Sequence, residues 1–140
     1  MARMPLTAFT FIKPLTLSIA AVVICLSVGS IALRAADLPP AETTRIQTLI
    51  AAVEGMTDAT FIRNGRSYEA GAAAEFLRRK WQQHRMDVRS ANDFIEKVAS
   101  YSSTTGQPYL VRFNDGREVP CSVFLREELS KLRKQEGPLD

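Results

Sequence analysis

Apolar residues recur at helical spacing in four stretches of the chain. The first covers about residues 42–56, where the apolar positions fall at i, i+3, i+4, i+7 and i+10: Ile46, Leu49, Ile50, Val53 and Met56. The second covers about residues 70–84, the third begins after Ser90 as its N-cap, and the fourth begins after Pro120. This pattern predicts four helices, each with one apolar face to bury.

Two short segments between these helices show the signals of β-hairpins. In FIRNGRSY, the dipeptide Asn64-Gly65 favours a type I′ turn, whose two central residues both need positive φ. In YLVRFNDGREV, residues 109–113 alternate as a strand and Asn114-Asp115-Gly116 turns the chain. We therefore predict a single α+β domain over residues 42–134, with about four helices packed on a small antiparallel sheet of two hairpins. Residues 37–41 are interpreted as a linker and residues 135–140 as a frayed tail.

An uncharged apolar run, residues 14–33, precedes this domain. Arg3 and Lys13 lie before the run and small residues follow it, which is the layout of a secretory signal peptide. The run is also about as long as a helix that spans a bilayer. We expect residues 1–36 to be a signal peptide that places the domain in the periplasm. The alternative is an uncleaved helix that anchors the domain in the inner membrane, facing the periplasm.

The net charge of +3 arises in the N-terminal segment. Three of the 18 basic residues, Arg3, Lys13 and Arg34, lie before residue 37, and all 15 acidic residues lie from Asp37 onward. The rest of the chain therefore carries 15 basic against 15 acidic groups. Since a neutral domain has no electrostatic footprint for nucleic acid, we expect no nucleic-acid partner. Membrane contact is expected only through the N-terminal segment, where this segment is retained.

The domain carries few groups for catalysis or metal binding. Its one histidine, His84, and its one cysteine, Cys121, cannot make a structural zinc site, and Cys121 falls on the apolar stripe of the last helix. We expect no metal, no cofactor and no catalytic residue. The basic residues around Trp81, which are Arg78, Arg79, Lys80 and Arg85, are interpreted as a solvated helix face with the indole turned inward. The alternative is a site for phospholipid headgroups.

The segment SYSSTTGQPY, residues 100–109, carries seven hydroxyl side chains. It follows a helix and enters a strand, so it lacks the helix N-terminus that a phosphate-binding loop needs. We interpret its Ser and Thr side chains as partners of backbone groups at the helix end and in the turn. Gly106 is expected to supply a backbone angle closed to other residues, and Pro108 an extended entry to the strand. A catalytic or ligand-binding loop is the alternative.

Three motifs resemble a known family: FIRNG with Tyr68, RRKW at the end of an Ala-rich helix, and FIEKVASYSSTTGQPYLVR. Together they resemble the YfeK-like family of small secreted bacterial proteins, a domain of unknown function, over about residues 43–130. The resemblance implies export and no particular reaction. The polar positions that match the family are taken as candidate ligand-binding residues: Arg63, Asn64, Tyr68, Ser100, Ser102, Ser103 and Tyr109.

The expected function follows from two features, the predicted export and the absence of a catalytic motif. We expect an envelope protein without enzymatic activity that binds a partner protein or a small ligand. The alternative is a small envelope hydrolase that uses hydroxyl or carboxylate groups near the 100–109 loop.

Overall fold

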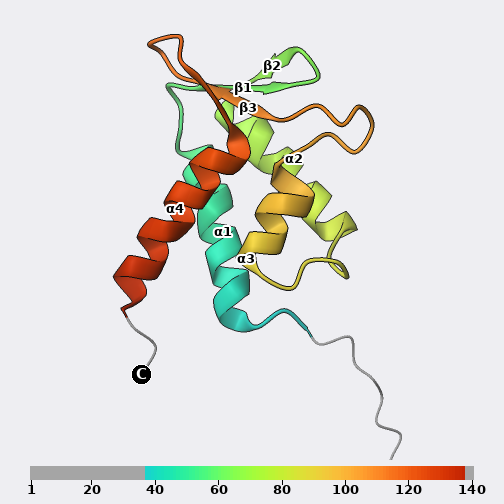
Figure 1. The fold of residues 1–140 in the computed structure, drawn as a ribbon, viewed down its shortest axis with the longest axis vertical. Coiled ribbons are helices and arrows are strands. Elements are labelled where there is room, and N and C mark those ends of the chain that lie inside the picture. The colour runs from blue at the N-terminus through green and yellow to red at the C-terminus, as the bar shows by residue number, and fades with distance from the viewer. Residues whose placement is uncertain (1–36, 138–140) are drawn as a thin grey trace, which may run out of the picture. The chain divides into compact units, whose positions relative to one another are not determined.

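A computed structural model describes residues 37–137 (Figure 1), so the predicted signal peptide or anchor lies outside the described residues. The described elements are α1 (Pro40–Glu54), β1 (Thr60–Arg63), β2 (Arg66–Tyr68), α2 (Ala70–Gln83), α3 (Ala91–Asp93), the π-helix η1 (Phe94–Ala99), β3 (Leu110–Arg112), β4 (Glu118–Pro120) and α4 (Cys121–Glu136). Because η1 continues α3 without a break, the two form the third predicted helix. The α+β class with four helices is confirmed.

The four strands form one antiparallel sheet in the order β2-β1-β3-β4. The first predicted hairpin joins β1 to β2, and Asn64 and Gly65 at its tip have φ of 50° and 73°, as a type I′ turn requires. The second joins β3 to β4. Phe61 of β1 pairs with Tyr68 on one side and Val111 on the other, so β1 connects the two hairpins.

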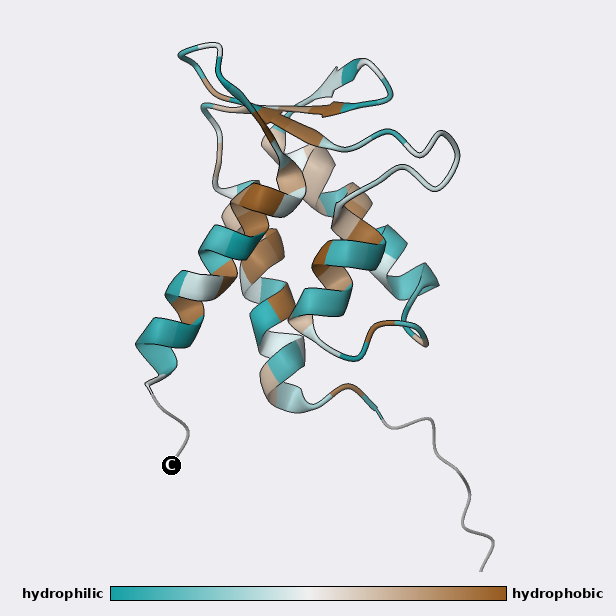
Figure 2. Cartoon of the chain, in the orientation of Figure 1, coloured by the Kyte–Doolittle hydropathy of each residue, from teal (hydrophilic) through white to brown (hydrophobic). Residues whose placement is uncertain are grey.

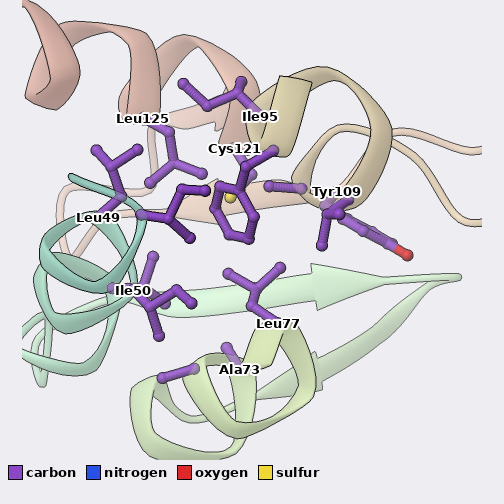
Figure 3. Packing of buried hydrophobic residues seen from close by; sticks show 14 of the residues in the cluster. Leu49, Ile50, Ala73, Leu77, Ile95, Tyr109, Cys121 and Leu125 are labelled. Carbon is purple, nitrogen blue, oxygen red and sulfur yellow. The ribbon is translucent and has the colours of Figure 1, made fainter. Parts of the chain in front are cut away.

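The helices gather on one side of the sheet and bury their apolar faces against one another and against it (Figures 1 and 2). Leu49 and Ile50 of α1, Leu77 of α2 and Leu125 of α4 meet in the interior (Figure 3). Cys121 is 2% exposed at the start of α4, within the same cluster. The apolar stripes predicted for these helices therefore form a single core.

Both ends of the helical region extend further than expected. Helix α1 begins at Pro40, inside the segment interpreted as a linker, because proline fits the first turn of a helix, where its missing N–H is not needed. Helix α4 continues to Glu136, inside the segment expected to fray. There the Arg45 side chain of α1 donates from Nε to the Glu136 carboxylate at 3.0 Å, which holds the last turn.

The third helix begins as predicted and then winds differently. The Ser90 hydroxyl accepts from the Asp93 amide at 3.1 Å, so Ser90 is the N-cap. From Phe94 onward the helix is a π-helix, and it ends where the Ser100 hydroxyl donates to the Ile95 carbonyl at 2.6 Å. None of the helices in residues 37–137 is both long enough and apolar enough to cross a bilayer.

Candidate functional site

A pocket of about 160 Å³ lies between α2 and the sheet. Its apolar walls come from both sides, with Phe61 on β1, Leu77 on α2 and Leu110 on β3. Few polar side chains reach it, and most of them are long or aromatic: Arg63, Tyr68, Glu75, Arg79 and Tyr109. An apolar concavity with a small number of placed polar groups is the usual form of a ligand site.

Arg63 enters the pocket from the end of β1, just before the tight turn. Its guanidinium carbon lies 4.1 Å from the centre of the Phe76 ring, in cation–π contact. The Phe76 ring in turn meets the Tyr109 ring edge-on, with 5.7 Å between the ring centres. The Nε atom of Arg63 is buried and makes no hydrogen bond among residues 37–137. This stack fixes the guanidinium beside Tyr109 and leaves one of its donors without a partner.

Lys80 of α2 approaches Tyr109 from within the protein. Its side chain is only 6% exposed, and Nζ donates to the Tyr109 hydroxyl at 3.1 Å and to the Tyr101 carbonyl at 2.7 Å. Burial, together with the neighbouring Arg63 guanidinium, lowers the pKa of the Lys80 ammonium to about 8. The Lys80 side chain is thus mostly protonated at neutral pH, but its pKa lies only slightly above that pH.

The Tyr109 hydroxyl is the point at which these groups meet. Tyr109 lies at the edge of the core, with its hydroxyl directed away from the packed side chains (Figure 3). Burial raises the pKa of this hydroxyl, while Arg63 and Ser102 act in the opposite direction. The Ser102 hydroxyl is close enough for this effect, yet its oxygen, like Arg63 Nε, falls short of hydrogen-bond geometry.

The site carries positive charge that the described part of the chain does not neutralise. Neither Arg63 nor Lys80 forms an ion pair with a carboxylate of residues 37–137. Glu75 lines the pocket but pairs with Arg79 at 3.4 Å, where both side chains are largely exposed. In the same residues, no three His, Cys, Asp or Glu side chains gather as metal ligands would. The arrangement therefore suits an anion more than a cation.

The structure brings together some of the candidate residues predicted from the sequence. Arg63, Tyr68 and Tyr109 line the pocket, and Ser102 is buried beside Tyr109. The other three candidates lie elsewhere. Ser100 is buried with its hydroxyl bound to the Ile95 carbonyl, Asn64 accepts from the Thr105 hydroxyl at 2.6 Å at the exposed hairpin tip, and Ser103 is exposed.

Two residues of the site, Phe76 and Lys80, were not predicted as site residues. The interpretation of the basic residues around Trp81 as a solvated face holds for Arg78 and Arg79, whose side chains are 44% and 65% exposed, and it is wrong for Lys80. The sequence does contain the signal. Lys80 stands three residues after Leu77 and seven after Ala73, so it falls on the apolar stripe of α2.

Comparisons with known proteins give a family match that runs across the helices and strands described above. A family model described as a family of unknown function, DUF5329, matches residues 40–133, which run from the start of α1 into the last turns of α4. The uncharacterized protein YfeK of Salmonella typhimurium is 41% identical over 68 residues. That match covers 49% of this chain and 57% of the relative, so it spans little more than half of the relative's length. No solved structure gives a significant match. Because the family model covers most of the chain, the protein belongs to the DUF5329 family of unknown function.

Proposed function

We propose that this chain is an exported envelope protein whose domain binds a small carboxylate in the pocket between α2 and the sheet, without carrying out a reaction on it. The observation that carries the proposal is the convergence of Arg63 and Lys80 on Tyr109 with no carboxylate partner among residues 37–137. Buried charges in proteins are normally paired. A bound carboxylate would supply the missing partner.

The size of the pocket limits the ligand. Its volume of about 160 Å³ is well below the roughly 300–1,000 Å³ of sites for drug-sized molecules. The pocket therefore suits one carboxylate on a short apolar or aromatic body, either as a free organic acid or as part of a larger partner. The carboxylate would face the Arg63 guanidinium and the Tyr109 hydroxyl, and the apolar body would lie against Leu77 and Leu110.

The same geometry favours binding over catalysis. A nucleophilic hydroxyl or thiol needs a base within hydrogen-bond reach. The Ser102 hydroxyl has no hydrogen-bond partner among the described residues. The Cys121 thiol is buried, and burial raises its pKa to about 12, so it remains a thiol at neutral pH.

Calorimetric titration of the purified protein with benzoate tests the proposal. We expect saturable binding that Arg63→Gln weakens about tenfold or more, because hydrogen bonds to charged groups contribute about 1.5–3 kcal/mol. The matched control is Arg117→Gln, which removes the same charge from the exposed β3–β4 turn and should bind benzoate like the original protein.

Two results would contradict the proposal. One is benzoate affinity that does not differ between Arg63→Gln and Arg117→Gln. The other is hydrolysis of a small ester by the protein that Ser102→Ala abolishes while the fold is retained, which would favour the alternative of an envelope hydrolase.

A further inference from the structure

A second pocket lies between α1 and the end of α2 and shares no lining residue with the candidate site. Its volume is about 480 Å³, within the range of pockets that hold small molecules. Gln47 and Ile50 come from α1, Trp81 and Gln82 from α2, and Arg85 from the turn that follows α2. The pocket thus has an apolar base and a polar rim.

One residue that lines this second pocket, Trp81, has a buried hydrogen-bond donor without a partner among the described residues. The indole Nε1 of Trp81, which can only donate, is buried and makes no hydrogen bond among residues 37–137. The indole packs edge-on against the Phe94 ring, with 6.1 Å between the ring centres, and this contact fixes its orientation. A buried donor left without an acceptor costs about 1–3 kcal/mol, which an acceptor from a ligand would recover.

The charges around the second pocket have one sign. Arg78 and Arg85 line it and no carboxylate does. Arg78 already pairs with Glu54 across the α1–α2 interface. Arg85 forms no ion pair within the described part of the chain, so its guanidinium is available. Guanidinium and indole N–H groups both donate, and the ligand that they suit must accept.

We propose that this second pocket binds a small molecule that carries an oxyanion, either a carboxylate or a phosphate. Its oxygens would accept from Arg85 and from the exposed amides of Gln47 and Gln82. One oxygen would reach Trp81 Nε1 once the side chains that cover this atom turn aside. The apolar part of the ligand would lie against Ile50. The proposal does not depend on the candidate site described above.

The fluorescence of Trp81 provides the test, because it is the one tryptophan of the chain. The protein is titrated separately with citrate and with inorganic phosphate, at constant ionic strength set by sodium chloride. We expect a saturable change of Trp81 emission, and the anion that gives the lower Kd identifies the oxyanion. Arg85→Gln should weaken binding about tenfold or more. Arg117→Gln removes the same charge elsewhere and should leave the titration unchanged.

Three results would overturn the inference. The first is the absence of a saturable change with either anion up to about 100 mM, a concentration that fills any site of useful affinity. The second is equal affinity in Arg85→Gln and in the original protein. The third is a signal that Arg63→Gln abolishes and Arg85→Gln leaves intact, which would place the anion in the other pocket and support only the proposed function.

Discussion

The ammonium group of Lys80 is held in the interior by two neutral acceptors, the Tyr101 carbonyl and the Tyr109 hydroxyl. Neither acceptor carries a negative charge to balance the ammonium, and the nearby positively charged Arg63 guanidinium repels it. These conditions lower the pKa of Lys80 because they disfavour its charged form. A carboxylate bound in the pocket would have the opposite effect and raise this pKa. Ligand binding and protonation of Lys80 are therefore linked.

We predict that the ligand-free protein gains stability from Lys80 as the pH rises from about 8 toward 10.5. Over this range Lys80 has lost its proton in the folded state, where its pKa is about 8, while the unfolded chain keeps the proton up to the ordinary value of 10.5. Because the unfolded state then binds more protons, the free energy of unfolding rises with pH. Denaturant unfolding at several pH values measures it.

Lys80→Met is the control for this measurement, because it removes the titrating group and keeps a long side chain. Tyr109 and Cys121 have raised pKa values, that of Cys121 being about 12, so their deprotonation lowers stability at alkaline pH. The difference between the original protein and Lys80→Met isolates the contribution of Lys80. Parallel pH profiles for the two proteins would contradict the assignment.

At the scale of elements, the 100–109 loop positions Tyr109. The Ser102 amide donates to the Gln107 carbonyl at 2.9 Å, and the Gly106 amide donates back to the Ser102 carbonyl at 2.8 Å, which closes the loop on itself. The Tyr109 amide donates to the Ser100 carbonyl at 3.0 Å, and the Tyr109 carbonyl accepts from the Cys121 amide at 2.8 Å. The loop thus attaches the end of η1 and the start of α4 to the residue at the centre of the candidate site.

Gly106→Val should destabilise the domain by about 1–3 kcal/mol, the usual cost of a strained backbone. Gly106 has a φ of +70°, a conformation that β-branched residues rarely adopt. A Cβ atom added at this position would meet nothing within 4 Å, so we attribute the expected loss to the backbone angle and not to a clash of the Cβ atom. Thermal or denaturant unfolding of the variant measures the effect.

Two further variants separate backbone strain from other causes. Gly106→Asn should be tolerated better than Gly106→Val, because asparagine adopts positive φ more readily. Ser103→Ala, at an exposed position of the same loop, should change stability by less than about 0.5 kcal/mol. If valine and asparagine at position 106 gave equally stable proteins, the role assigned to the backbone angle would be wrong.

Features fixed by local chemistry could be predicted from the sequence, and features fixed by distant contacts could not. The Asn64-Gly65 turn and the Ser90 cap each depend on a few adjacent residues, and both are confirmed. The pairing of β1 with β3 joins segments about fifty residues apart, and no local signal specifies it. The burial of Lys80 depends in the same way on the loop that brings Tyr101 and Tyr109 over α2.

At the scale of the whole molecule, charge is balanced overall and unbalanced locally. The 15 basic and 15 acidic groups after residue 36 cancel, and many of them pair on the surface, as Arg112 and Glu118 do on neighbouring strands. Each of the two pockets that carry our proposals has a basic lining residue that forms no ion pair within the described residues, Arg63 in one and Arg85 in the other. The two anion sites that we propose, on a domain of balanced charge, would suit a protein that selects small ligands and does not attract polyanions.

We further propose that the domain reaches the periplasm through residues 1–36, and this can be tested in the cell. A reporter that is active only outside the cytoplasm is fused after Asp140, beyond the last helical residue, Glu136, so that the fusion leaves α4 intact. We expect reporter activity from the full chain and none from the same fusion without residues 1–36, because the uncharged run 14–33 has the layout of an export signal.

N-terminal sequencing of the active fusion then separates the two forms of export. A new N-terminus within residues 33–37 would show a cleaved signal peptide, since small residues occupy this junction. An intact N-terminus in the membrane fraction would show an anchor, for which the length of the apolar run is sufficient. A silent full-length fusion that accumulates in the soluble cytosol would refute export. The periplasmic role would then be lost, while the two anion sites, which depend on residues of the folded domain, would remain open to the titrations described above.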